Sequence, residues 1–241
     1  MGKLFGTDGI RGVVGENLTA DLAFRTGKAI AAVLKEEKGR KPVITIGKDT
    51  RISSDMLEAA LSAGICSVGG DVLLLGTIPT PAVAFLTVQE QADAGVVISA
   101  SHNPYEHNGI KVFNAQGYKL PDAMEERVEA LILSGAEMPI KTGGALGRCR
   151  NGAQEMHDDY VSHLIDTIGC DLSGLRVLVD CANGAAAATA PDLFQRLPMM
   201  ADFINIDPDG VNINNGCGST HLEQLATMTV AGKYHLGIAF D

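Results

Sequence analysis

A polar segment between two apolar runs, residues 98–113, carries the side chains best suited to chemistry. Its Asn-Pro and Asn-Gly pairs are turn signals, so the chain can double back and return Lys111 to the neighbourhood of Ser101. A serine hydroxyl is a weak nucleophile until a partner group takes its proton. Phosphoryl transfer mainly requires positioning and cations around the transferred group. The hydroxyl of Ser101, the imidazole of His102 and the ammonium of Lys111 are suited to that chemistry.

Other interpretations of the polar residues remain open at this point. Segment 98–113 can be a loop whose Asn, Pro and Gly only build turns. A serine hydrolase is disfavoured because Ser101 lacks a G-x-S-x-G elbow, and the adjacent Ser101 and His102 project in different directions. A nucleotide-binding module is weakly indicated, since residues 216–221 begin like G-x-G-x-x-G but end in His and follow a polar loop.

The elements that must position this segment alternate between strand and helix patterns. The first cycle has apolar runs at 43–47, 72–76 and 94–98, with helix patterns at 19–38, 54–68 and 81–90. A second cycle has strand patterns at 175–180, 203–206 and 236–240, with helix patterns at 184–196 and 221–232. Thr19 is the expected N-cap of the first helix, and Pro81 lies in the first turn of the third. This alternation indicates βαβ units and an α/β fold with mostly parallel sheets.

A Gly-rich segment without a clear period, residues 134–152, separates the two cycles. Such segments are typical of domain boundaries. We therefore predict two successive domains, 1–145 and 155–241, each with a mixed, mostly parallel sheet packed between helices.

Composition excludes several classes of protein. The 241 residues carry a formal net charge of −10, which argues against nucleic-acid binding but allows a small anionic substrate. No apolar run approaches the roughly 20 residues of a membrane span, and the first residues show no signal peptide. The five cysteines are widely spaced without a C-x-x-C pair, so neither a disulfide framework nor a zinc site is indicated. We expect a cytoplasmic protein with no nucleic-acid or membrane partner.

Segment 98–113 resembles the phosphoserine loop of the α-D-phosphohexomutase superfamily, a T/S-x-S-H-N-P element followed by N-G-x-K. Five further matches follow in the family's order, at residues 5–12, 46–51, 77–81, 179–185 and 212–221. They are most similar to the branch that acts on glucosamine phosphates, while sister branches act on mannose or glucose phosphates. The resemblance implies a hexosamine phosphate substrate and a bisphosphate intermediate that reorients in the cleft. It also allows a homodimer.

The resemblance also implies roles for individual residues. Ser101 would be the phosphorylated residue that gives and reclaims the phosphoryl group, and His102 would position or polarise the reacting phosphate. Lys111 would act as a general base or an electrostatic stabiliser. Arg11 would hold a phosphate near the serine, in keeping with the bidentate pairing of guanidinium and phosphate. A structural salt bridge in a Gly-rich turn is the alternative for Arg11.

A magnesium site is implied at the other end of the sequence. The superfamily's D-G-D-x-D-R loop binds Mg²⁺ through three carboxylates together with the phosphoserine. Residues 237–241 match the strand that leads into this loop, so Asp241 corresponds to its first Asp, and Ser101 and Asp241 are the expected metal ligands. The remaining carboxylates are not in this sequence, which looks like a fragment, and one carboxylate with a phosphate is a poor substitute for the full set. An inactive remnant that only folds or accepts phosphate is therefore a further alternative.

Two neighbouring motifs have a structural interpretation. Lys48, Asp49 and Arg51 follow a strand end and either line the cleft or belong to the start of the next helix. We expect Asp49, Ser53 or Ser54 to cap that helix, and the role of Arg51 stays open. Residues 214–220 have the composition of a tight loop, for which we expect no catalytic role.

Overall fold

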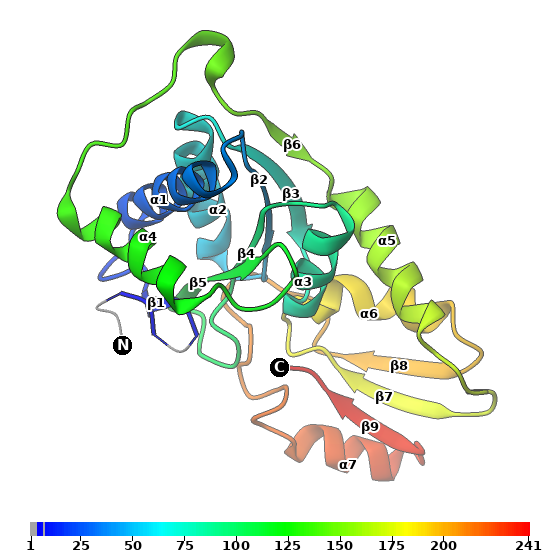
Figure 1. Cartoon of the computed structure of the whole chain (residues 1–241). Helices are drawn as coiled ribbons and strands as arrows, with labels where there is room; N and C mark the ends of the chain where they lie inside the picture. The colour runs from blue at the N-terminus through cyan, green and yellow to red at the C-terminus, as the bar shows by residue number, and fades with distance from the viewer. Residues whose placement is uncertain (1–3, 7) are drawn as a thin grey trace.

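Two β-sheets organise the chain in the computed structural model, which describes residues 4–6 and 8–241 (Figure 1). The N-terminal motif at 5–12 is described except for its Thr7, and the first three residues also lie outside the described part. Within that part, no helix is both long and apolar enough to cross a membrane.

The first sheet has six strands in the order β1-β5-β4-β2-β3-β6. Strands β4, β2, β3 and β6 are parallel, and β5 runs antiparallel to both of its neighbours. The prediction of an α/β fold with a mixed, mostly parallel sheet is confirmed. The strand bounds are β1 (Ile10–Val13), β2 (Val43–Lys48), β3 (Asp71–Thr77), β4 (Ala94–Ile98), β5 (His107–Asn114) and β6 (Cys149–Asn151).

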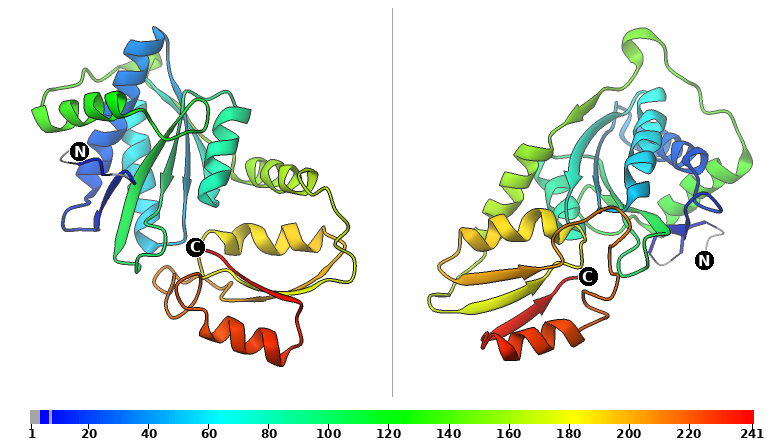
Figure 2. Two further views of the ribbon diagram at one scale, coloured as in Figure 1. Left: turned by 60° about the horizontal axis from the view of Figure 1, so that its bottom comes forward. Right: turned by 180° about the vertical axis from the view of Figure 1, so that it is seen from behind.

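Helices cover both faces of the first sheet (Figures 1 and 2). The helices of one face are α1 (Ala20–Lys38), α2 (Ile52–Ser67) and α4 (Asp122–Ser134), and those of the other are α3 (Thr80–Gln89) and α5 (Ala153–Asp166). Thr19 caps α1 as predicted, since its hydroxyl accepts from the Leu22 N–H at 3.1 Å. Helices α1 and α2 pack closely because Gly27 has no side chain: a Cβ there would lie 2.3 Å from the Leu61 carbonyl oxygen.

The second sheet has three parallel strands in the order β8-β7-β9. They are β7 (Arg176–Asp180), β8 (Met200–Ile204) and β9 (Leu236–Ala239), with α6 (Ala186–Gln195) and α7 (Glu223–Ala231) on opposite faces (Figure 2). Val177 and Val179 are buried against α6, as expected for alternate residues of a strand. The strand and helix patterns of the second cycle are thus present, with bounds shifted by a few residues.

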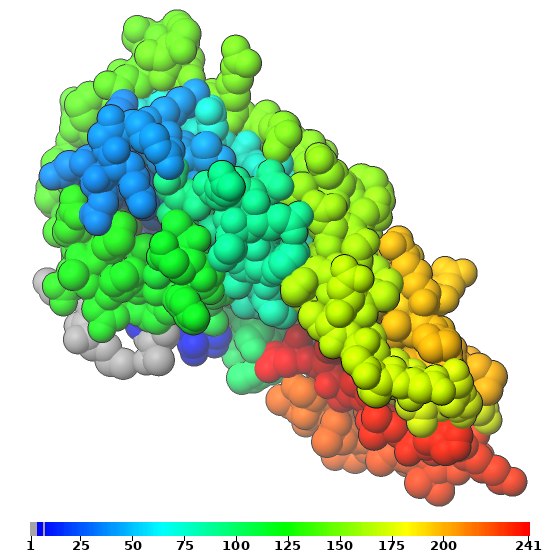
Figure 3. Space-filling view, turned by 45° about the vertical axis from the view of Figure 1, so that its right-hand side comes forward, coloured from blue at the N-terminus to red at the C-terminus, as the bar shows by residue number. Residues whose placement is uncertain are grey.

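Strand β6 and helix α5 connect the first sheet to the second along the chain. Strand β6 pairs in parallel with β3, so the first sheet extends past the predicted domain limit at residue 145. Helix α5 packs on β3 and also on α6, and its segment runs along the surface between the two regions (Figure 3). The division into 1–145 and 155–241 therefore remains a prediction, with α5 as a contact shared by both sheets.

Candidate active site

The carboxyl ends of strands from both sheets meet at Ser101. Strand β4 ends three residues before Ser101, and β9 of the second sheet ends two residues before Asp241. In open α/β sheets this is the edge at which ligands bind. A cavity of about 550 Å³ lies there, and its polar lining includes Arg11, Ser101, Lys111 and Asp241.

The Ser101 hydroxyl lies between a carboxylate and an imidazole. It donates to Asp241 Oδ1 at 2.6 Å and lies 3.4 Å from His102 Nδ1. His102 Nδ1 in turn lies 3.8 Å from Asp241 Oδ2. The structure therefore brings together three of the residues that the sequence singled out, including a pair that lies 140 positions apart. Asp241 and His102 are both about half exposed, so the hydroxyl faces an open site.

Two cations line the same cavity from the adjacent strands β1 and β5. Arg11 is paired in register with Gly109, two residues from Lys111. Arg11 Nη2 lies 3.6 Å from Asp8 Oδ2, and Lys111 Nζ lies 3.7 Å from Asp8 Oδ1. Asp8, which the sequence analysis did not single out, thus contacts both cations. Each cation side chain keeps 29% of its surface exposed, which leaves both able to meet an anionic group.

Arg51 connects a buried ion pair to the serine loop, residues 99–106. Its side chain is fully buried, and Nη1 donates to the Asp49 carboxylate. Its other terminal nitrogen, Nη2, donates to the backbone oxygens of Ser101 at 3.0 Å and Asn103 at 2.6 Å. Burial lowers the pKa of the Arg51 guanidinium, and the Asp49 carboxylate opposes that change. The open question about Arg51 is thus answered in part: it holds the backbone of the serine loop.

The predicted capping of α2 is wrong. The helix begins at Ile52 with Arg51 in the N-cap position, and no side chain caps it there. Asp49 instead accepts from the Ser54 hydroxyl at 3.0 Å and from the Arg51 N–H at 3.0 Å. The reason is electrostatic: a buried carboxylate needs a cation and several donors, and Arg51 supplies the cation.

The side chain of Lys48 does not line the cavity, because it forms ion pairs with two carboxylates of α2. Its ammonium contacts Asp55 at 2.7 Å and Glu58 at 2.6 Å. Burial lowers the Lys48 pKa, but the hydrogen bonds to these carboxylates outweigh burial and leave the pKa raised. Lys48 is therefore charged and structural in this position.

Asn214, in a loop of the second sheet, also reaches the serine loop. Its Nδ2 donates to the Ser101 carbonyl at 2.9 Å and to the Asn103 carbonyl at 3.1 Å. Sequence reasoning treated residues 214–220 as a tight loop and missed this contact. The one available signal was the match of this segment to a family element, because its composition alone indicates only turns.

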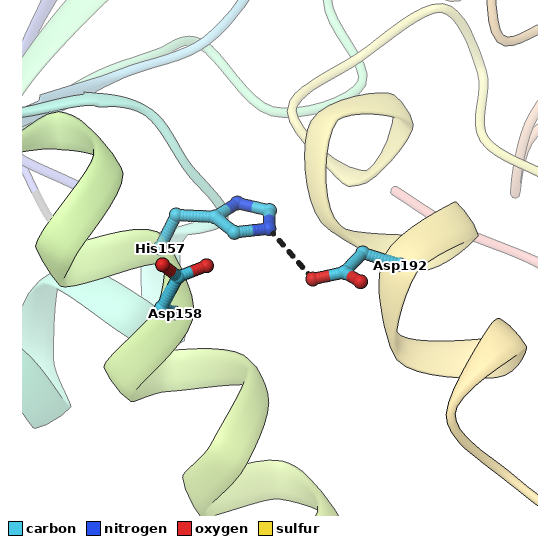
Figure 4. Close-up of side chains that lie close together, drawn as sticks. All are labelled: His157, Asp158 and Asp192. Carbon is cyan, nitrogen blue, oxygen red and sulfur yellow. Dashed lines mark hydrogen bonds and ion pairs between the residues drawn. The ribbon is translucent and has the colours of Figure 1, made fainter.

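One group of three potential metal ligands lies elsewhere in the described residues, between α5 and α6 (Figure 4). It comprises His157, Asp158 and Asp192, with His157 Nε2 3.2 Å from Asp192 Oδ2. The guanidinium of Arg196 already pairs with Asp192 at 2.7 and 2.9 Å and lies 3.9 Å from Asp158. This cation offsets the carboxylate charge, so the cluster is better explained as a helix–helix contact.

Comparisons with known proteins agree with this fold. Residues 2–138 match the family model for phosphoglucomutase/phosphomannomutase, alpha/beta/alpha domain I. Phosphoglucosamine mutases of Acetivibrio thermocellus and Moorella thermoacetica are 54% and 55% identical over all of this chain, which spans 54% of each. The solved structure of a phosphoglucomutase/phosphomannomutase family protein from Burkholderia thailandensis aligns with a TM-score of 0.82 at 27% identity, over 99% of this chain and 52% of that one. The chain therefore belongs to the phosphoglucomutase/phosphomannomutase family, the α-D-phosphohexomutases.

Proposed function

We propose that this chain is the phosphoserine-bearing part of a phosphoglucosamine mutase, which interconverts glucosamine 6-phosphate and glucosamine 1-phosphate. The observation that carries the proposal is the Ser101 hydroxyl, which faces a cavity lined by Arg11 and Lys111. The identity of 54–55% to phosphoglucosamine mutases over the whole chain supports the choice of sugar. Since the chain spans about half of those relatives, the activity belongs to the full-length protein.

The reaction is a pair of phosphoryl transfers. Phospho-Ser101 gives its phosphoryl group to a free hydroxyl of the sugar phosphate: the sugar oxygen bonds to phosphorus, and the bond between phosphorus and Ser101 Oγ breaks. The proton of the sugar hydroxyl passes to a nearby base, and Ser101 Oγ takes up a proton to become a hydroxyl. The resulting hexose bisphosphate reorients in the cleft. Ser101 Oγ then attacks the other phosphorus, the sugar oxygen leaves, and the serine proton passes to a nearby base. Catalysis of this kind depends mainly on alignment and charge stabilisation.

The polar residues around Ser101 suit distinct parts of that reaction. Arg11 presents a guanidinium that can pair bidentately with a phosphate. Lys111 would stabilise the transferring group or exchange its proton, and His102 would position the group beside the serine. In the unphosphorylated protein, Asp241 already accepts a hydrogen bond from the hydroxyl at 2.6 Å. A phosphate anion would compete with Asp8 for both cations.

Ser101 and Asp241 supply part of the oxygen ligand set that a magnesium ion takes. Mg²⁺ takes oxygen ligands and usually keeps several waters, and these two side-chain oxygens lie 2.6 Å apart on residues that line the cavity. A phosphate on Ser101 would place more negative charge beside the Asp241 carboxylate, and a divalent cation would offset that repulsion. We propose that phospho-Ser101 and Asp241 hold Mg²⁺, which when bound would neutralise charge that develops during transfer.

Phosphate incorporation tests the central role of Ser101. The protein is incubated with glucose 1,6-bisphosphate and Mg²⁺, and intact-mass and peptide mass spectrometry locate the phosphate. We expect one phosphate on Ser101, none in Ser101→Ala, and normal labelling in Ser173→Ala, a control at an exposed serine outside the cavity. In the full-length protein, Ser101→Ala should abolish mutase turnover. Substantial residual turnover in that variant would overturn the assignment.

The second candidate is a phosphomannomutase or phosphoglucomutase of the same family. The Burkholderia thailandensis structure favours it, since that protein's description names both sugars, but at 27% identity the support is weaker. Comparing kcat/KM of the full-length protein on glucosamine, mannose and glucose 6-phosphates decides between them. A preference for either neutral sugar would overturn the glucosamine assignment. Cytoplasmic location and dimerisation remain predictions.

A further inference from the structure

Two backbone carbonyls of the serine loop each accept two side-chain hydrogen bonds. The Ser101 oxygen accepts from Arg51 Nη2 at 3.0 Å and from Asn214 Nδ2 at 2.9 Å. The Asn103 oxygen accepts from the same two nitrogens at 2.6 and 3.1 Å. A carbonyl oxygen has two lone pairs, and each of these nitrogens carries two hydrogens. The four bonds therefore use every lone pair and every hydrogen, and we call this arrangement the carbonyl clamp.

The two donors of the carbonyl clamp come from different sheets. Arg51 follows β2 of the first sheet, while Asn214 lies in the loop between β8 and α7 of the second sheet. That loop is anchored to its own sheet: Asn214 N–H donates to the Ala182 carbonyl at 2.9 Å, and Gly218 N–H donates to Asp180 Oδ2 at 2.9 Å. A displacement of the second sheet would therefore pull directly on the Ser101 carbonyl.

The backbone at Ser101 is one that needs such support. Its φ is +55°, in the left-handed region that residues other than glycine seldom adopt. Conformations of this kind persist only where surrounding contacts over-determine them, and they gather at functional sites. The carbonyl clamp supplies two such contacts at Ser101, whose hydroxyl must be aligned with a phosphorus atom, and two more at Asn103 in the same loop.

Two further contacts join the same surfaces, so the carbonyl clamp belongs to a continuous junction. The Thr50 hydroxyl donates to the Asn183 carbonyl at 2.6 Å, and the Ile52 N–H donates to the Gly210 carbonyl at 2.9 Å. These bonds hold the sheets together without contacting the serine loop. Only Asn214 reaches from the second sheet to the Ser101 and Asn103 carbonyls among the hydrogen bonds of the described residues.

We propose that Asn214 is a positioning residue for phosphoryl transfer, which sets the geometry of Ser101 from the second sheet through the carbonyl clamp. The proposal rests on the proposed function, since it concerns the alignment of the phosphorylated serine. Asn214 binds the loop backbone rather than the hydroxyl, so its effect reaches the reaction through Ser101. Through this contact, the rate of phosphoryl transfer would depend on the orientation of the second sheet.

The variant that isolates this role is Asn214→Gly. Residue 214 has a φ of +59°, which glycine adopts without cost, so the change removes the amide and leaves the backbone acceptable. Asn214→Asp is the stronger test, because a carboxylate oxygen would replace the donor and face two carbonyl oxygens. Asn215→Ala is the matched control, an exposed asparagine of the same loop outside the carbonyl clamp.

The first measurement is the rate of Ser101 phosphorylation by glucose 1,6-bisphosphate and Mg²⁺. We expect the rate constant at saturating bisphosphate to fall about 10- to 100-fold in Asn214→Gly, and further in Asn214→Asp, because small misplacements of a reacting group are costly. The half-saturating concentration should stay within about twofold, because the cations that meet the phosphates are unchanged. An unaltered rate constant, or an equal fall in Asn215→Ala, would overturn the proposal.

The second measurement separates this proposal from the proposed function. Hydrogen exchange of the Asn103 amide, which donates to the Ala100 carbonyl at 3.2 Å within the serine loop, should be faster in Asn214→Gly than in Asn215→Ala. If the unaltered protein is never phosphorylated, the proposed function fails, and this exchange result still decides whether Asn214 holds the loop. Unchanged exchange in Asn214→Gly would overturn the carbonyl clamp itself.

Discussion

Each sheet places a buried aspartate at the carboxyl end of a strand, and the two are satisfied in different ways. Asp49 follows β2 directly and is 4% exposed, while Asp180 ends β7 and is fully buried. Asp49 pairs with the guanidinium of Arg51. Asp180 accepts from three neutral donors, the N–H groups of Ala182 and Gly218 and the side-chain amide of Asn205.

The difference separates two ways of building a site. The carboxylate of Asp49 brings a cation into the interior, and the unused hydrogens of that cation hold the serine loop. The carboxylate of Asp180 instead gathers neutral donors, one of which, the Gly218 N–H, lies in the loop that carries Asn214. The first arrangement depends on a charge balance, and the second on the sum of several dipoles. They should therefore respond differently to substitution.

The largest effect is expected when the charge balance is broken. Arg51→Met leaves Asp49 as a buried carboxylate without its cation, which typically costs about 3 to 5 kcal/mol of folding free energy. Urea denaturation should report this loss. The double variant Asp49→Asn with Arg51→Met removes both charges and should recover part of it. If Arg51→Met alone is at least as stable to urea as the double variant, the ion pair does not account for the loss.

A smaller effect is expected at the dipole-held carboxylate. Asp180→Asn keeps the shape of the side chain but replaces one carboxylate oxygen with an NH₂ group. That group is a donor and cannot accept a hydrogen bond from the N–H groups that face it. We expect a loss of about 1.5 to 3 kcal/mol, the range for hydrogen bonds to a charged group. Urea denaturation again measures it, with Asp171→Asn, at an exposed turn, as the control. If Asp180→Asn lowers the free energy of unfolding by more than Arg51→Met does, the charge-paired aspartate is not the more sensitive of the two.

The smallest effect is expected at a carboxylate outside both interiors, in the contact between α5 and α6. Arg196→Ala removes the partner of Asp192, a surface pair worth less than about 1 kcal/mol. Burial tends to raise the pKa of Asp192, but the hydrogen bonds from Arg196 and His157 outweigh it and lower the pKa. This contribution is present above the ordinary aspartate pKa and is lost as the pH falls through the lower folded value.

A pH series of unfolding measurements therefore sharpens the last prediction. Arg196→Ala should differ from the unaltered protein near neutral pH, and the difference should shrink below about pH 4. High salt should shrink it as well, because exposed charges are screened. A difference that neither acidification nor high salt reduces would mean that Arg196 acts through packing rather than through its charge.

The helices and strands were predictable to different degrees. Strands β2 and β4 and helix α1 carry strong apolar patterns, and the sequence predicted them at 43–47, 94–98 and 19–38. Strand β6 has three exposed residues and pairs with β3 through its backbone, so no apolar side-chain pattern could indicate it. Helix α5 does carry Met156 and Tyr160 at helical spacing on its buried face, a signal that the Gly-rich segment before it obscured.

The sequence by itself determined the α/β class and which loop carries Ser101, His102 and Lys111, because turn signals and apolar periodicity are local. It also indicated Arg11 and Asp241 through their motifs. Only the tertiary structure decided that the Ser101 hydroxyl donates directly to Asp241, that Arg51 binds the backbone of the serine loop, and that Asn214 shares its acceptors. These contacts follow from where the carboxyl ends of two sheets meet. A buried polar group takes whichever partners that meeting provides, since leaving it unpaired costs more free energy than any local preference.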